Sequence, residues 1–174
     1  RHLMEYVYNS TPLFALLLIL ATLLCALVAG LLFAFAVVTM PGIRRLSDRE
    51  FIRAFQLMDD VIQKNQPIFM LVWLGSAALM LVATVWGNSQ LDAVGRGLIV
   101  VAAALYILGV QVPTALINVP LNNKLQTLDV DTMDESAQTA ARRDFEPRWN
   151  RWNRIRTIVA TIVTTLLLFL LFLI

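Results

Sequence analysis

Charged residues are missing from four long stretches of this 174-residue sequence. The stretches are residues 6–43, 65–91, 97–123 and 157–174, which hold 38, 27, 27 and 18 residues. Charged residues make up 15% of the chain and apolar residues 59%, with a mean hydropathy of +0.72. A helix crosses a bilayer with about 17 to 25 predominantly apolar residues. The pattern therefore excludes a soluble globular domain and a disordered chain. It predicts an all-α, four-transmembrane-helix bundle.

Cysteine and histidine are nearly absent, since the chain has only Cys25 and His2. A single cysteine excludes an intramolecular disulfide and a C-x-x-C redox pair, and we expect Cys25 to be a small buried apolar residue. Haem, copper and di-iron sites depend on imidazole or thiolate ligands, and no expected span carries a carboxylate. We therefore expect no metal and no cofactor. The net charge of +2 comes from interleaved acidic and basic residues, so no nucleic-acid partner is expected.

The apolar runs and their flanking signals predict a single membrane domain over residues 1–174. We expect residues 1–3 to precede the native start at Met4. Spans are expected at about residues 12–40, 67–87, 97–119 and 155–174, and amphipathic loop helices at about 48–64 and 133–145. Ser47 and Glu50 form a capping-box pattern that opens the first loop helix.

Prolines modify two of these elements. Pro113 and Pro120 lie in the second half of the third span. Each removes a backbone donor and clashes with the preceding turn, so they predict a broken third helix. A second capping box, Thr132 to Glu135, is expected to open the second loop helix, and Glu146-Pro147 is expected to start the last helix.

The loops after the first and third spans carry twelve Lys and Arg residues, against two on the other side. This bias predicts both long loops in the cytoplasm and both termini outside, in a bacterial inner membrane. Ala26, Gly30 and Ala34 recur every four residues on the first span. Such a stripe fits either a homodimer or close packing inside the monomer.

Two polar clusters lie near the cytoplasmic ends of the third and fourth spans. The first comprises Gln111, Thr114, Asn118, Asn122 and Asn123, and the second comprises Trp149, Asn150, Trp152, Asn153 and Arg156. Trp149, Trp152, Asn153 and Arg156 are expected on one helix face at i, i+3, i+4 and i+7, with Asn150 and Arg154 alongside. If this face turns inward, amides, a guanidinium and indole rings would line a pocket able to bind a planar or anionic ligand.

A simpler interpretation of both clusters stays open. Trp149 and Trp152 would then be membrane-interface anchors. The asparagines would only satisfy carbonyls that the prolines leave unbonded.

Three segments carry a family resemblance. They are the Pro41-Gly42-Ile43 exit with its following helix, the Asn118-Val119-Pro120-Leu121-Asn122-Asn123 segment, and Trp149-Asn150-Arg151-Trp152-Asn153 with Arg156. On the basis of these segments, which are spread along nearly the whole chain, the sequence resembles the DUF1772 family, also called anthrone-oxygenase-like. The resemblance implies a small four-span protein. Some members are assigned to the oxidation of anthrones to anthraquinones without metal or flavin.

The favoured hypothesis is a cofactor-independent oxygenase or oxidoreductase acting on a hydrophobic aromatic, anthrone-like molecule between helices three and four. The candidate catalytic residues are Asn118, Asn122, Asn123, Asn153 and Arg156, and the candidate substrate-binding residues are Gln111, Trp149, Asn150 and Trp152. No obvious general base is present, because Asp144 and Glu146 are the only carboxylates beside the clusters. Either the substrate is acidic enough to lose its proton unaided, or Glu146 has to be basic enough to accept it.

The alternative is a non-catalytic membrane module that binds a lipid, a quinone or a partner protein. A proton-coupled transporter is disfavoured, because such proteins place an acidic residue within a span.

Overall fold

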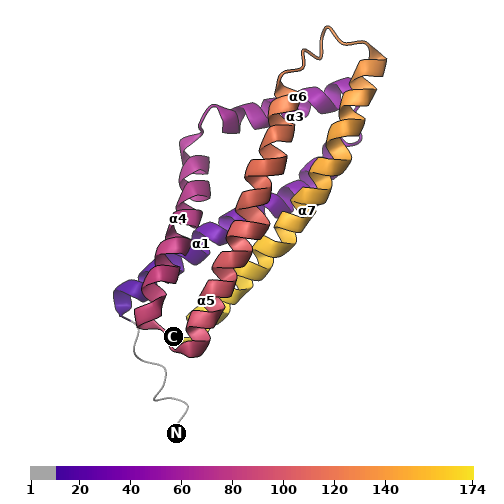
Figure 1. Ribbon diagram of the computed structural model, residues 1–174. Coiled ribbons are helices and arrows are strands. Elements are labelled where there is room, and N and C mark those ends of the chain that lie inside the picture. Colours follow the sequence, from indigo (N-terminus) through magenta and orange to yellow (C-terminus); the bar gives the residue numbers. More distant parts are fainter. Residues whose placement is uncertain (1–10) are drawn as a thin grey trace.

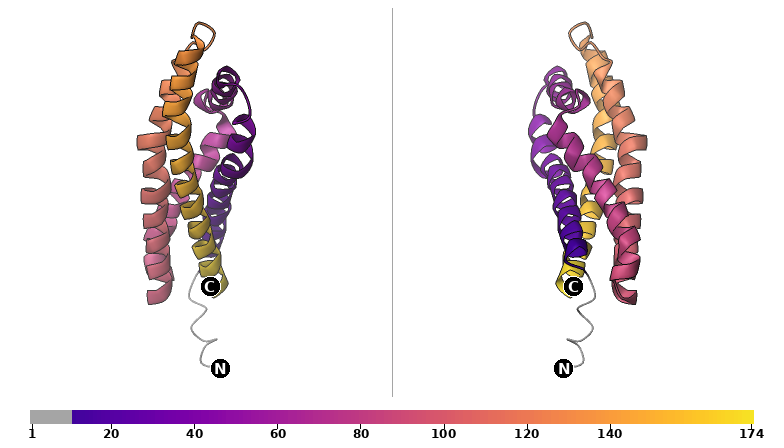
Figure 2. Two further views of the ribbon diagram at one scale, coloured as in Figure 1. Left: turned by 90° about the vertical axis from the view of Figure 1, so that its right-hand side faces the viewer. Right: turned by 90° about the vertical axis from the view of Figure 1, so that its left-hand side faces the viewer.

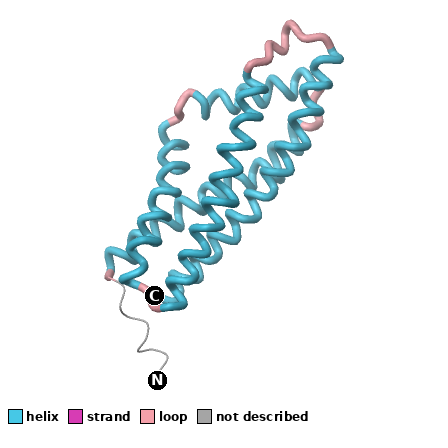
Figure 3. The backbone as a smooth tube through the Cα atoms, in the orientation of Figure 1, coloured by secondary structure: helices cyan, strands magenta, loops and turns pink. Residues whose placement is uncertain are grey.

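The computed structural model describes residues 11–174, all of them in helices or short connections (Figures 1 and 3). The expectation about residues 1–3 lies outside this range. Four helices are long and apolar enough to cross a membrane: Pro12–Ile43, Pro67–Gln90, Ala93–Gln126 and Glu135–Leu173. The described part of the chain contains no strand. The predicted all-α, four-span fold is confirmed, and these helices fit an integral membrane protein.

The first span consists of α1 (Pro12–Ala34), a π-helical segment (Phe35–Thr39) and α2 (Met40–Ile43). The second span is α4 (Pro67–Gln90). The third runs through α5 (Ala93–Tyr106), two π segments (Ile107–Gln111 and Thr114–Asn118) and α6 (Val119–Gln126). The fourth is α7 (Glu135–Leu173). Helix α1 packs on α4 and α7, and α5 packs on the same two helices, so the four spans form a closed ring.

The core of the ring is apolar, and small side chains alternate with large ones within it. Phe14, Leu18, Met80, Tyr106 and Leu167 are fully buried there, among alanines and valines. The small-residue stripe of the first span does not contribute to this core, because Gly30 and Ala34 are exposed. The expectation that this stripe packs closely inside the monomer is therefore wrong.

Each π segment ends just before a proline. The N–H groups of Met40, Val112 and Val119 donate to carbonyls five residues back, and each of these residues immediately precedes a proline. A proline ring clashes with the carbonyl of the preceding turn, and one wider turn relieves that clash without ending the helix. The expected interruption of the third span thus takes the form of π-helical turns, and the helix continues through both prolines.

The last helix differs from the prediction. Instead of a loop helix ending at Phe145 and a new start at Pro147, α7 is one helix of 39 residues with Pro147 inside it. Its N-cap is Asp134, whose carboxylate accepts from the Ala137 N–H at 2.8 Å, rather than Thr132. Pro147 and Arg143 are exposed, so water can satisfy the carbonyl that loses its partner. At 1.5 Å per residue α7 is roughly 58 Å long and extends far beyond a hydrocarbon layer about 30 Å thick.

Helix α3 (Asp48–Gln63) lies across the end of the ring from which α7 projects, and the C-terminus lies at the other end (Figures 1 and 2). Its predicted capping box is confirmed, with both Ser47–Glu50 hydrogen bonds present. Phe51 and Phe55 are buried against Phe145 of α7, with ring centroids 6.4 and 4.6 Å apart. The apolar face of the loop helix therefore covers the bundle.

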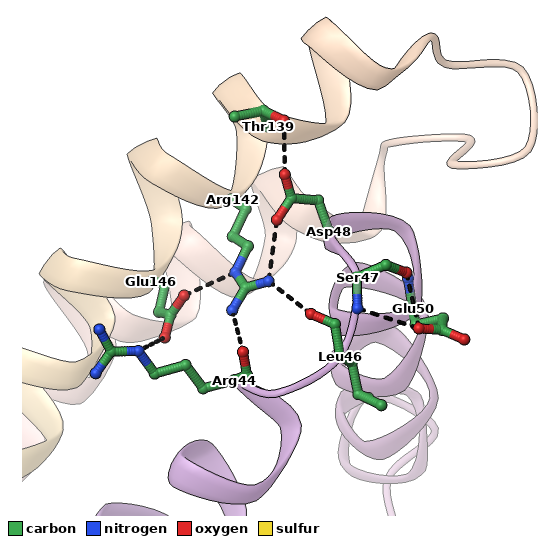
Figure 4. A network of polar contacts seen from close by, with 8 residues as sticks. All are labelled: Arg44, Leu46, Ser47, Asp48, Glu50, Thr139, Arg142 and Glu146. Atoms are coloured by element: carbon green, nitrogen blue, oxygen red, sulfur yellow. Dashed lines mark hydrogen bonds and ion pairs between the residues drawn. The ribbon is translucent and has the colours of Figure 1, made fainter.

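One guanidinium fixes the turn between α2 and α3 onto α7 (Figure 4). Arg142 donates to the carbonyls of Arg44 and Leu46 at 2.7 and 3.0 Å, and to the carboxylates of Asp48 and Glu146 at 3.0 and 2.8 Å. The guanidinium also lies 4.4 Å from the centroid of the Phe51 ring. The polar turn that precedes α3 therefore has its partners on α7.

We expect Arg142→Ala to lower the free energy of unfolding by about 2 kcal/mol, because the substitution leaves two carboxylates and two carbonyls without their donor. Thermal unfolding of the detergent-solubilised protein would measure the loss. Arg143→Ala is the matched control, because Arg143 is exposed. Equal stability of the two variants would contradict the role assigned to Arg142.

Asp48 makes this contact dependent on pH. Its pKa lies below the ordinary 3.8, first because Thr139 donates to it and second because Arg142 does. A lowered folded-state pKa stabilises the fold at pH values above the unfolded-state pKa, and this contribution is lost as the pH falls through the folded-state pKa. Melting temperatures measured from pH 7 down to pH 3 should therefore fall less steeply for Asp48→Asn than for wild type. Parallel curves would show that Asp48 makes no such contribution.

Candidate functional site

A cavity of about 260 Å³ lies under α3, at the end of the bundle that this helix covers. All four spans and α3 contribute to its wall, so it is wider than the predicted pocket between the third and fourth spans. Its lining residues are Leu31, Leu32, Phe35, Phe55, Met58, Asp59, Ile62, Phe69, Met70, Trp73, Thr114, Asn118, Val119, Asn122, Trp149, Asn153 and Arg156. It is larger than the ~150 Å³ cavity that accommodates benzene in an engineered protein core.

Most of the wall is aromatic or aliphatic. Phe69 and Trp73 of α4 stack with ring planes 17° apart and centroids 5.5 Å apart. Phe35 and Phe55 lie 5.7 and 5.4 Å from the Trp149 ring, between centroids. Flat surfaces of this kind favour a planar aromatic ligand.

Arg156 forms the deepest polar layer of the cavity. Its side chain is 3% exposed and donates from Nη1 to Thr114 Oγ1 at 2.8 Å and from Nη2 to Asn153 Oδ1 at 3.1 Å. Within residues 11–174 its Nε has no hydrogen-bond partner. The guanidinium is therefore held in place by two neutral oxygens, and one of its three nitrogens, Nε, keeps its N–H without a partner.

Asn153 and Asn118 form the middle layer and differ sharply in their bonding. Asn153 Nδ2 donates to the Leu32 carbonyl at 3.0 Å, and its Oδ1 accepts from Arg156. Asn118 is 2% exposed, and neither atom of its amide finds a partner in the described chain. A buried amide with no partner is costly, and this one lies at the cavity wall.

A relay of hydrogen bonds forms the layer nearest α3. Trp149 Nε1 donates to Asn122 Oδ1 at 2.9 Å, and Asn122 Nδ2 donates to Asp59 Oδ1 at 2.7 Å. The other carboxylate oxygen, Oδ2, accepts from Gln63 and Gln126 at 2.8 and 3.0 Å. The relay joins α7, α6 and α3, so this helix closes the cavity through polar as well as apolar contacts.

Five of the nine predicted site residues line this cavity: Asn118, Asn122, Trp149, Asn153 and Arg156. The other four do not. Gln111 is half-buried at the end of a π segment, and Asn123 is exposed and bonds Gln63 at 3.0 Å. Trp152 is half-buried elsewhere on α7, and Asn150 lines a surface groove beside Arg154. The structure thus gathers part of the predicted set, and the catalytic role of each residue stays a prediction.

The carboxylate that lines the cavity was missed by sequence reasoning, which considered Asp144 and Glu146. Asp144 is exposed, and Glu146 binds Arg142 and Arg44 outside the cavity. Asp59 lies in the wall instead and is 4% exposed. A signal was present, because Asp59 follows Phe55 by four residues and so falls on the apolar face of α3.

A family model described as Anthrone oxygenase matches residues 59–166. The match runs from Asp59 past Arg156 and so includes the polar residues of all three layers. The chain belongs to the anthrone oxygenase family, which confirms the resemblance found in the sequence. Neither the curated proteins nor the solved structures include a match to this chain.

We expect Asn118→Leu to raise the free energy of unfolding of the ligand-free protein by about 1 kcal/mol, because it removes two unpaired buried polar atoms. The melting temperature should rise accordingly. Asn153→Leu is the matched comparison. It should lower stability by about 2 kcal/mol, because it removes a hydrogen bond to the Leu32 carbonyl and leaves the buried Arg156 Nη2 without its Asn153 acceptor. Destabilisation of equal size in both variants would show that Asn118 has partners in the ligand-free protein.

Proposed function

We propose that this protein is a membrane oxygenase that converts an anthrone-like aromatic ketone into the corresponding quinone with O₂ and without a cofactor. The observation that carries the proposal is the unpaired polar set in an aromatic cavity, namely the Asn118 amide and Arg156 Nε. A ligand oxygen that accepts from both groups would hold a ketone in place, and the two donors would stabilise the oxyanion formed when the ketone loses a proton. Membership of the anthrone oxygenase family supports this assignment.

The proposed reaction needs one O₂ for each substrate. Loss of a proton from the methylene opposite the carbonyl gives an electron-rich aromatic anion. This anion transfers an electron to O₂, and the resulting radical pair forms a carbon–oxygen bond. Loss of the second methylene hydrogen with cleavage of the oxygen–oxygen bond gives the new carbonyl and one water. The substrate itself is the reductant, and both O₂ and aromatic substrates dissolve in the bilayer around the cavity.

The chain's own residues would bind and orient the substrate. Arg156 and Asn118 hold the carbonyl oxygen, Asn153 fixes the guanidinium, and the aromatic wall holds the rings. Most of the rate enhancement would come from stabilising the anion in a site of low dielectric constant. The near absence of histidine and cysteine from the sequence supports a reaction without a resident metal.

The charge bias of the loops supports a topology with both termini outside and both long loops in the cytoplasm. In that orientation α3 and the cavity lie at the cytoplasmic face. A ligand would reach the cavity from the surrounding lipid.

A quinone-binding module is the second candidate, because quinone oxygens would satisfy the same two donors. The candidates differ in turnover. The oxygenase consumes one O₂ for each anthrone, whereas the binding module retains its ligand without consuming O₂.

We expect Arg156→Lys to lower kcat for anthrone oxidation by about 100-fold or more, because lysine retains the charge but loses the Nε donor and the fork that bonds Thr114 and Asn153. Oxygen uptake and quinone absorbance, followed together in detergent, would measure the loss. The exposed Arg151→Lys serves as control. Ligand binding without oxygen uptake by the wild-type protein would reject the oxygenase in favour of the binding module.

A further inference from the structure

Within residues 11–174, Asp59 is the only carboxylate that lines the cavity. It lies on α3 between Phe55 and Ile62, which both line the same wall. The side chain therefore projects from the cover of the cavity toward its interior.

The bonding of Asp59 differs from that of three other aspartates on or beside α3. Asp48, Asp60 and Asp131 each pair with a lysine or arginine, whereas the contacts of Asp59 in residues 11–174 are with amides. Amide donors hold the carboxylate in place and leave its charge uncompensated. A carboxylate accepts about four hydrogen bonds, and Asp59 receives three. One acceptor position of Asp59 therefore stays without a hydrogen bond in the described chain.

Asp59 and Arg156 mark the two ends of the polar ladder in the cavity. Arg156 Cζ lies 5.9 Å from the centroid of the Trp149 ring, and from Trp149 the relay continues through Asn122 to Asp59. A planar ketone bound by its carbonyl at Arg156 would turn its opposite edge toward α3. In an anthrone that edge carries the methylene whose proton must be removed.

We propose that Asp59 is the general base of the reaction, and this proposal rests on the proposed function. The carbon–hydrogen bond of the methylene breaks, and the proton passes to an Asp59 oxygen. The electron pair delocalises into the rings and onto the ketone oxygen, which Arg156 and Asn118 bind. No electron leaves the substrate in this step, so O₂ is required only afterwards. The proton on Asp59 leaves later in the water released from O₂.

Hydrogen–deuterium exchange tests this step separately from oxidation. Anthrone is incubated anaerobically with the detergent-solubilised protein in deuterium oxide, and deuterium in the methylene is measured by mass spectrometry against a protein-free blank. We expect the wild-type protein to accelerate exchange and Asp59→Asn to lose at least about 100-fold of that acceleration. Asp60→Asn is the matched control, because Asp60 is the neighbouring carboxylate and pairs with Lys64.

A second variant distinguishes loss of the base from loss of folding. Asp59→Glu keeps the charge and moves the carboxylate by one methylene, so exchange should fall several-fold while anthrone still quenches tryptophan fluorescence. Wild-type exchange rates in both Asp59 variants, or no acceleration by the wild-type protein, would overturn the role of Asp59. Oxygen uptake separates the two proposals. If the protein consumes O₂ but its exchange rate does not depend on Asp59, Asp59 is not the base and the oxygenase proposal stands. If exchange depends on Asp59 but no O₂ is consumed, Asp59 is the base and the protein is not an oxygenase.

A different observation carries a second proposal. A groove between the end of the first span and α7 is lined by Arg44, Arg45, Asn150 and Arg154, with Ala36, Met40 and Pro41 as its apolar part. Arg44 makes only a long contact of 3.8 Å with Glu146, which Arg142 binds more closely. In the described chain Arg45 and Arg154 belong to no ion pair. Three cations therefore gather where apolar spans give way to charged segments.

We infer that this groove binds the phosphate of an anionic phospholipid. Guanidinium groups bond phosphate oxygens in a forked geometry, and Asn150 adds an amide donor. The exposed Val37, Val38 and Ile158 continue from the groove along the apolar part of the spans, where acyl chains would lie. Basic pockets between membrane helices bind acidic lipid headgroups in this way.

Native mass spectrometry with equal amounts of phosphatidylglycerol and phosphatidylcholine tests the groove. We expect preferential retention of phosphatidylglycerol, and a loss of about tenfold or more in Arg45→Gln/Arg154→Gln. Arg96→Gln/Arg148→Gln removes the same charge outside the groove and should keep the preference. Equal retention of the two lipids, or displacement of phosphatidylglycerol by inorganic phosphate at millimolar concentration, would overturn the lipid site.

Discussion

A buried guanidinium that has no carboxylate partner within residues 11–174 determines how the end of the bundle under α3 is built. Arg156 lies among apolar spans, and its hydrogen bonds go to Thr114 and Asn153. Burying a charge in this way is expensive unless polar groups surround it. The asparagine and threonine side chains facing it therefore have a structural task. They hold a positive charge that remains available to a ligand, which a paired aspartate would have neutralised.

The prolines give this polar end its shape. A π turn holds one residue more than an α turn, so residues before and after it are rotated by about 100° relative to a straight helix. Two of the three π segments contribute Phe35, Thr114 and Asn118 to the cavity wall. Without the wider turns the third span would present a different set of side chains to Arg156.

The same rotation explains which site residues could be predicted from the sequence. Trp149, Asn153 and Arg156 lie on a regular helix, so their i, i+4, i+7 spacing predicts their common place in the cavity wall. Trp152, expected on the same face at i+3, does not line the cavity. A regular third span would predict Gln111 in the same pocket as Asn118. Gln111 instead ends a π segment and does not line the cavity. A proline within a charged segment predicts the start of a helix, but Pro147 lies inside α7. The sequence does not show that the Arg143 carbonyl, which loses its donor, is exposed to water. Asp59 was missed because only the packing of α3 over the bundle makes its position meaningful.

The charges of the cavity also fit the proposed chemistry. With both groups ionised, the empty cavity holds one negative charge at α3 and one positive charge at its deep end. Proton transfer to Asp59 neutralises the carboxylate and moves the negative charge onto the ketone oxygen beside Arg156. Two separated charges thereby become one close ion pair, which is strongly favoured where the dielectric constant is low. A weak carboxylate base becomes sufficient for a carbon acid under these conditions, because the guanidinium stabilises the product of the transfer rather than the base.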